Sequence, residues 1–284
     1  MSDMIDSGAA VAPAALHEAF GQAFADYLIG PFQLAPEQWP GFLARQGVDL
    51  GLSRVLRGAD GAILAFAFVA PRPALRVWRL ATMGAVPAAR GSGAAPRLLD
   101  DFIARAAAAG QDAVELEVFA QNERALRLYQ GRGFVARHAL HGYLAAPERV
   151  RPAPAPGLRV VSLEQAFDWL ARAEAHIPEL PLQVTATALR VAPGLTAWQC
   201  GAAQLVFGRP DAQTVTIASL IDTGPGQQDA AALLRALREA CPAAQLRVPQ
   251  LQRLDLGGAA LRDQGFEPQA LHQLLMRRPL PTEE

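Results

Sequence analysis

The chain has 284 residues, which is enough for one large domain or two of ordinary size, and 51% of them are hydrophobic while 19% are charged. This composition can fill a core and excludes an intrinsically disordered chain. The formal net charge of -1 combines 26 basic with 27 acidic residues. The sequence has neither a broad excess of basic residues nor a polybasic segment, so neither a nucleic-acid partner nor a membrane partner is expected.

The ends of the chain and its cysteines carry little signal. Asp3 and Asp6 stand near the N-terminus without a basic region followed by an apolar core, so no signal peptide is expected. No apolar run reaches the roughly 18 residues that a membrane span needs. Cys200 and Cys241 lie far apart, without the spacing of a metal site or a disulfide framework. We expect a cytoplasmic protein that binds no metal.

The first hundred residues alternate between helical and strand patterns. Residues 1–13 are small and Ala-rich and predict a mobile tail. An Asp60-Gly61 pair predicts a hairpin turn between two strands. The periodicity predicts, in order, helices from about residue 16 and over 36–45, and strands over 53–56, 62–69 and 78–86.

A turn of small residues follows the strand 78–86 and precedes a helix predicted over 96–109. The first N–H groups of a helix lack intrahelical partners and lie at the positive end of its dipole, so this turn suits a pyrophosphate. Small side chains let the anion approach the main chain, and an arginine can add a charge-assisted hydrogen bond. The residues concerned are Arg90, Gly91, Ser92, Gly93, Ala94 and Ala95.

A strand over 113–118, a helix over 122–129 and a Gly133-Phe134 pair come next, and 139–144 is predicted as a closing strand. This order resembles the GNAT superfamily of N-acetyltransferases. The acyl-CoA loop of that family, R/Q-x-x-G-x-G/A, is matched by Arg90, Gly93 and Ala95. Its later signature, N-x-x-A-x-x-L-Y-x-x-x-G-F, is matched by Asn122, Ala125, Leu128, Tyr129, Gly133 and Phe134. The resemblance covers the first half of the chain.

Four prolines between residues 147 and 157 favour an extended linker. They predict a first domain over 14–146 and a second over 158–281. The second half repeats the first with a strand over 218–222, helices over 230–240 and 258–264, and a strand over 245–248. The positions of the motif residues are occupied by other residue types: Pro225 for Arg90, Gln228 for Gly93, Leu254 for Asn122 and Leu261 for Tyr129. We therefore expect an α/β (α+β) protein of two GNAT-like domains, each a twisted mixed β-sheet flanked by helices, with a degenerate second copy.

The resemblance assigns roles to residues around the acyl-CoA loop. It implies that Ala85 and Val86 lie beside the thioester, with backbone N–H groups that polarise its carbonyl. It also implies that Asn122 binds the pantetheine amides, although Asn equally suits a helix N-cap. Tyr129 would protonate the leaving sulfur, because a phenol with a pKa of about 10 stays protonated at neutral pH. The alternative for Tyr129 is a packed aromatic side chain.

The general base is left open by the sequence. Glu115 and Glu117 stand two apart on one strand and therefore share a face. By resemblance Glu117 is the better candidate, acting through water. The alternative is an exposed or salt-bridged glutamate.

We thus expect transfer of an acetyl group from acetyl-CoA to a primary amine, by direct attack in a ternary complex. The acceptor would be a small-molecule amine, or else a protein amine, and the protein a monomer or homodimer with one CoA site per chain. The alternative is a non-catalytic acyl-CoA-binding sensor or scaffold.

Overall fold

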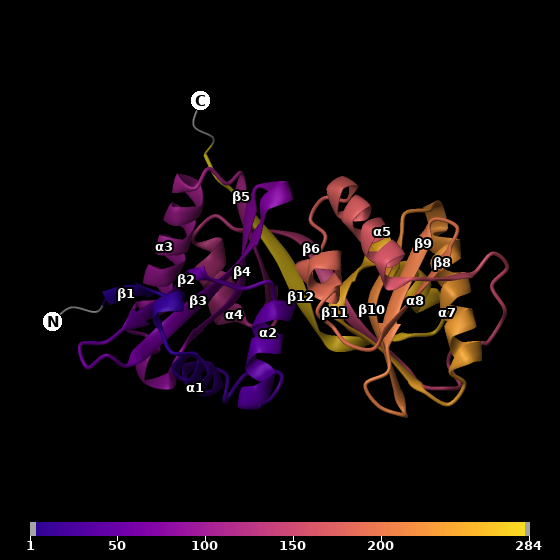
Figure 1. Cartoon of the computed structure of the whole chain (residues 1–284), viewed down its shortest axis with the longest axis horizontal. Coiled ribbons are helices and arrows are strands. Elements are labelled where there is room, and N and C mark those ends of the chain that lie inside the picture. Colours follow the sequence, from indigo (N-terminus) through magenta and orange to yellow (C-terminus); the bar gives the residue numbers. More distant parts are fainter. Residues whose placement is uncertain (1–3, 282–284) are drawn as a thin grey trace. The chain divides into compact units, whose positions relative to one another are not determined.

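The computed structural model describes residues 4–281, which divide into two compact units. Within this range, unit 1 consists of residues 4–117, 122–135 and 276–281, and unit 2 of residues 118–121 and 136–275. Each unit contains a β-sheet with helices beside it (Figure 1), which confirms the predicted fold class. None of the helices within residues 4–281 combines the length and apolar character that crossing a bilayer requires.

The strands of unit 1 lie in chain order in their sheet. They are β1 (Met4–Ser7), β2 (Asp49–Arg57), β3 (Ile63–Arg72), β4 (Val77–Ala85) and β5 (Ala113–Phe119). The first four pair antiparallel, and β4 pairs parallel with β5. The helices are α1 (Pro13–Ala23), α2 (Trp39–Arg45), α3 (Ala94–Ala108) and α4 (Glu123–Gln130).

The predicted mobile tail is wrong for the part of it that the structure describes. Met4 to Ser7 form β1, which pairs with Arg57 to Arg54 of β2. The first unit therefore begins before the predicted boundary at residue 14. The strand consists of Met, Ile, Asp and Ser, and its backbone hydrogen bonds to β2 hold this part of the chain in the sheet.

An aromatic cluster forms the core beneath α1 and α2. Phe20 of α1 is 2% exposed, and its ring centroid lies 5.2 Å from that of Trp39 and 5.1 Å from that of Phe42, both in α2. Phe66 and Phe68 alternate along β3 and so face the same side, where they complete the cluster. This cluster anchors the end of α1, which forms one wall of the site described below.

The strand β6 (Val135–Ala145) belongs to unit 2 from Ala136 onward, whereas the sequence placed it in the first domain. It pairs antiparallel with β11 (Gln245–Arg253), with Ala145 opposite Leu246. The predicted boundary at the prolines is therefore corrected to Val135. Prolines mark where regular structure must stop, but the hydrogen-bonding partner decides to which unit a strand belongs.

Unit 1 receives the end of the last strand, β12 (Glu267–Pro279), in return. The Leu280 N–H donates to the carbonyl of Asp112 at 2.9 Å, and the Arg278 guanidinium donates to the carbonyl of Arg132 at 2.8 Å. Arg277 lies 2.7 Å from the buried carboxylate of Glu115. The C-terminal segment is thus part of unit 1.

Unit 2 repeats the order of unit 1, with four antiparallel strands followed by a parallel one. Its further strands are β7 (Arg159–Val161), β8 (Leu195–Cys200), β9 (Ala203–Gly208) and β10 (Thr214–Asp222). Its helices are α5 (Leu163–His176), α6 (Ala186–Leu189), α7 (Gln228–Ala240) and α8 (Gly258–Asp263). A separate, mostly aliphatic core fills it, to which β9, β10, β11 and α7 contribute.

We predict that a chain ending at Leu275 loses about 3 kcal/mol of unfolding free energy, because it removes a partner of the buried Glu115 carboxylate. Urea unfolding monitored by circular dichroism measures this loss. A chain ending at residue 281 is the control and should match the full chain. Equal stability of the two truncated chains would contradict the assignment of the C-terminal segment to unit 1.

Candidate active site

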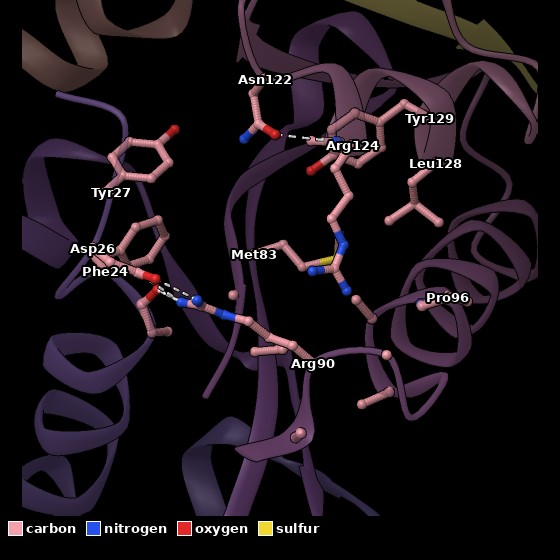
Figure 2. A pocket seen from close by; sticks show the side chains of 18 of the residues that line it. Phe24, Asp26, Tyr27, Met83, Arg90, Pro96, Asn122, Arg124, Leu128 and Tyr129 are labelled. Atoms are coloured by element: carbon pink, nitrogen blue, oxygen red, sulfur yellow. Dashed lines mark hydrogen bonds and ion pairs between the residues drawn. The ribbon is translucent and has the colours of Figure 1, made fainter. Parts of the chain in front are cut away.

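A pocket of about 590 Å³ opens in unit 1 (Figure 2). Four segments line it: the end of α1 with the loop after it, the end of β4, the turn that leads into α3, and the first two turns of α4. The pocket therefore lies where the sequence predicts the acyl-CoA site.

The end of β4 gives the pocket a wall of backbone. The parallel register of β4 with β5 runs from Val77 opposite Ala113 to Leu80 opposite Leu116 and ends there, although β4 continues to Ala85. Within residues 4–281 no other strand pairs with that edge of β4. The register with β3 also shifts at this point, which indicates a β-bulge. The N–H and C=O groups on the free edge can bind an extended chain that contains amides.

Ala85 lines this wall, whereas Val86, which the sequence placed beside it at the thioester, does not. The Val86 N–H donates to the carbonyl of Leu64 at 3.0 Å, and its side chain is buried in the core. Met83 and Gly84 line the pocket in its place. The sequence signal for them was available, because they precede Ala85 on the same strand.

The turn before α3 presents alternate N–H groups to open space. Those of Gly91, Gly93 and Ala95 have no acceptor among the described residues, whereas those of Arg90 and Ser92 donate back within the turn at 3.2 and 3.3 Å. Gly91 and Gly93 have φ angles of 84° and 88°, which favour glycine. A Cβ atom at either glycine would meet nothing within 4 Å. The turn is therefore an open anion site at a helix N-terminus.

Two predicted ligands serve the turn itself. The Ser92 hydroxyl donates to the carbonyl of Ala89 at 2.7 Å and accepts from the N–H of Ala94 at 3.4 Å. Ser92 does not line the pocket, while Ala94 lines it with its N–H already bonded. Ser92 therefore shapes the turn, and the cofactor contacts expected of Ser92 and Ala94 stay predictions.

Arg90 lines the pocket, but its guanidinium is engaged by a carboxylate. Its two terminal nitrogens lie 2.5 and 2.6 Å from the oxygens of Asp26, and one also donates to the carbonyl of Ala23 at 3.1 Å. This hydrogen bonding lowers the pKa of Asp26 and raises the pKa of Arg90. The sequence did not indicate Asp26, which lies 64 residues before Arg90.

Asn122 caps α4, as one of its two predicted roles required. Its side-chain oxygen accepts from the N–H of Ala125 at 3.2 Å. The side chain also lines the pocket (Figure 2), where its amide nitrogen has no partner among residues 4–281. The cap therefore fixes the amide with its donor side available to a ligand.

Tyr129 presents its hydroxyl to the same pocket (Figure 2). Its side chain is 7% exposed and packs edge-on against Phe134 at 5.9 Å between ring centroids. Burial raises the pKa of the Tyr129 phenol, and the nearby Tyr27 raises it further. Within the described residues the hydroxyl has no hydrogen-bond partner. It is thus a protonated donor that faces open space.

Arg124 was missed by the sequence reasoning. It lies in the first turn of α4, between Asn122 and Ala125 of the motif, and its exposed side chain extends into the pocket (Figure 2). No carboxylate pairs with it in the part of the chain that the structure describes. The available signal was its place inside the motif, one turn of helix before Leu128.

Comparison with known proteins agrees with this geometry. Residues 15–134 match the model of the acetyltransferase (GNAT) family. They form a GNAT-family domain. Members of this family are in general N-acetyltransferases that use acetyl-CoA as cosubstrate, and the match supports this general class of activity. No curated protein matches the sequence significantly.

Solved structures extend the likeness of fold to both units. A GCN5-related N-acetyltransferase from Sphaerobacter thermophilus has a TM-score of 0.66 at 16% identity, over 99% of this chain and 97% of that one. One from Anabaena variabilis has a TM-score of 0.67 at 13% identity, over 97% and 72%. One from Kribbella flavida has a TM-score of 0.64 at 14% identity, over 98% and 71%. At these identities the likeness shows the fold alone.

Glu117, predicted as the general base of the GNAT domain, does not reach the pocket. Its carboxylate lies 2.7 and 2.5 Å from two nitrogens of Arg79, and the two side chains are 4% and 2% exposed. Glu115 is held likewise by Arg72 at 3.0 Å and by Arg277. This is the salt-bridged alternative of the sequence analysis. Strand alternation placed the two carboxylates on one face correctly but could not show that arginines cover that face.

In unit 2 the place that corresponds to the anion site is filled by the protein itself. The buried carboxylate of Asp222, at the end of β10, accepts from the N–H of Gly224 at 2.8 Å and from the N–H of Ala230, in the first turn of α7, at 2.9 Å. A negative charge is therefore already present at this helix start, where the GNAT domain leaves N–H groups open.

Two glutamines fill the region between β10 and β11, whose parallel pairing ends at Thr216 opposite Arg247. Gln252 donates to the carbonyl of Leu220 at 3.2 Å. Gln227 donates to the carbonyl of Leu254 at 2.9 Å and accepts from the N–H of Ala260 at 3.0 Å. Backbone groups that a ligand could bind are satisfied internally.

We predict that Glu117→Gln lowers the unfolding free energy by about 3 kcal/mol, because it leaves the buried Arg79 without its counter-ion. Urea unfolding measures this loss. Glu123→Gln is the matched control and should change stability little, since that carboxylate is 79% exposed. The slope of acetyl transfer against pH should be the same in Glu117→Gln as in the native protein, and a changed slope would restore Glu117 as the base.

Proposed function

We propose that the GNAT domain transfers an acetyl group from acetyl-CoA to a primary amine by direct attack. One observation carries the proposal: a single pocket joins the free edge of β4, the open N–H groups of Gly91, Gly93 and Ala95, and the hydroxyl of Tyr129. These are a wall for an extended amide chain, a site for its diphosphate and a donor for its sulfur.

The residues present fit acetyl-CoA. The pantetheine arm contains amides that pair with the free edge of β4 and with the side-chain amide of Asn122. The diphosphate suits the turn, where the space beyond Gly91 and Gly93 is empty. Arg124 adds a positive charge to the pocket that no carboxylate of residues 4–281 neutralises.

When bound, the thioester supplies an activated carbonyl, and the residues of the pocket control its reaction. Backbone N–H groups of β4 stabilise negative charge that develops on the carbonyl oxygen. The amine nitrogen bonds to the carbonyl carbon as the C–S bond breaks, and Tyr129 gives its proton to the sulfur. An acceptor that enters as an ammonium ion gives one proton to water before the attack, because only the neutral amine has a lone pair, and a second proton passes to water as the amide forms. Tyr129 is reprotonated from water. The pocket lining contains no cysteine that could carry the acyl group.

A second candidate function is an acyl-CoA sensor without turnover. The observation that favours it is the absence, among the residues that line the pocket, of a histidine or of a carboxylate outside an ion pair. The two functions share the binding site and differ only in whether amines release CoA.

We predict by calorimetry that one CoA binds per chain, because unit 2 fills its own site. Arg124→Ala should weaken CoA binding about tenfold, since a charge-assisted hydrogen bond is lost. Arg127→Ala is the control: this arginine lies on the same helix, pairs with Glu123 and does not line the pocket. Two CoA sites per chain would contradict the prediction that unit 2 binds no CoA. The absence of any CoA binding would refute the proposed function itself.

We predict that Tyr129→Phe lowers the rate of acetyl transfer about 100-fold, because the sulfur then leaves without a proton donor. Thiol release with a panel of primary amines measures the rate, and the affinity for acetyl-CoA should stay within about twofold. Tyr143→Phe, a buried tyrosine of unit 2, is the control and should keep the native rate. A native rate in Tyr129→Phe would show that the phenol does not protonate the sulfur. If acetyl-CoA binds but no amine releases CoA, the sensor function is favoured.

A further inference from the structure

The end of α1 and the loop after it form the wall of the pocket that the acetyl-CoA site does not use. We call it the acceptor wall; its members are Phe24, Asp26, Tyr27 and Leu28. The rings of Phe24 and Tyr27 meet at right angles with centroids 4.9 Å apart. Phe24 in turn packs on Phe20 of the aromatic core at 4.8 Å, which holds the wall in place. The wall is therefore apolar and aromatic and carries one carboxylate.

Asp26 is the single carboxylate among the residues that line the pocket. The acidic side chains of β5 are unavailable, because Glu115 and Glu117 are buried in ion pairs with arginines. A protonated amine that enters the pocket therefore finds its only counter-ion on the acceptor wall.

Asp26 is covered by Arg90, and this cover is exchangeable. The side chains of the pair are 63% and 30% exposed, and exposed ion pairs are weak because water competes for both partners. Arg90 also begins the anion-binding turn, directly before the open N–H group of Gly91. A diphosphate on that turn competes with Asp26 for the same guanidinium.

We propose that Asp26 binds the ammonium group of the acceptor, and that acetyl-CoA uncovers it by drawing Arg90 toward the diphosphate. The acceptor is then a primary amine with one positive charge on an apolar or aromatic body. Polycations are disfavoured, because the other charged side chains of the pocket are Arg90 and Arg124. This inference rests on the proposed function and adds to it the substrate class and the order of binding.

Linkage gives the proposal a measurable consequence. If CoA releases Asp26, then CoA and the amine each strengthen the binding of the other by the same factor. CoA without its acetyl group serves as the probe, because no turnover then obscures the binding equilibrium.

The experiment compares 2-phenylethylamine with 2-phenylethanol, which has the same body without the charge, by calorimetry at pH 7. On the complex of native protein with CoA, the amine should bind at least about tenfold more tightly than the alcohol, as a charge-assisted hydrogen bond provides. Without CoA this preference should shrink about fivefold or more, because Arg90 then covers Asp26. Spermidine should bind more weakly than 2-phenylethylamine.

Asp26→Asn should abolish the preference for the amine while CoA binds at least as tightly as before, because Arg90 is freed. Asp100→Asn is the matched control. Asp100 forms a similarly exposed pair with Arg132 at 2.5 Å, with side chains 59% and 24% exposed, and does not line the pocket. This variant should behave as the native protein does in every measurement.

Each contrary result overturns a defined part of the proposal. A preference that survives in Asp26→Asn, or that is absent from the native complex, removes Asp26 as the ammonium site. An equal preference with and without CoA would show that Arg90 does not leave Asp26 when CoA binds. Loss of CoA binding in Asp26→Asn would show that Asp26 instead maintains the structure of the loop. Tighter binding of spermidine than of 2-phenylethylamine would refute the proposed substrate class of singly charged amines. Failure of the proposed function is distinct, since native protein would then either bind no CoA or bind CoA and acetylate no amine.

Discussion

Beyond Leu80 the strands β4 and β5 no longer share hydrogen bonds, and the whole candidate site depends on this separation. An unpaired strand edge inside a domain is costly unless its polar groups find partners, so it persists where a ligand supplies them. The turn into α3 continues from the open edge, and α4 follows the diverging strand. Backbone donors, a phosphate site and a phenol therefore meet in one pocket.

The charged residues of β5 illustrate how burial changes the role of a carboxylate. Glu115 and Glu117 resemble a base in composition, yet each is fixed by guanidinium groups. A buried ion pair is satisfied only while both charges remain, so these carboxylates serve the structure. The exposed Asp26 has the opposite character, because its arginine can be exchanged at little cost.

The two units show how one frame can keep or lose a binding site. Both have a helix that follows the fourth strand of an antiparallel run and a parallel strand beyond it. In unit 1 the helix start is open, whereas in unit 2 Asp222 supplies the anion and Gln227 and Gln252 occupy the crevice. Three polar side chains of unit 2 thus take up hydrogen-bonding groups whose counterparts in unit 1 face the pocket.

The sequence by itself determined the features that are local in the chain. The small-residue turn with Gly91 and Gly93, the cap formed by Asn122 and the position of Tyr129 depend on neighbours within one turn, so motif spacing located them. The repeated order of helices and strands was also predictable, because periodicity reports which face of each element is buried.

Only the tertiary structure decided which groups meet across the sheet. Strand alternation placed Glu115 and Glu117 on one face but could not reveal Arg79, 38 residues before Glu117. The exchange of β6 and the end of β12 between the units, and the Asp26–Arg90 pair, depend likewise on contacts between segments distant in the chain. Side-chain periodicity specifies the direction in which a residue points, whereas its partner is set by the packing of elements that no local pattern encodes.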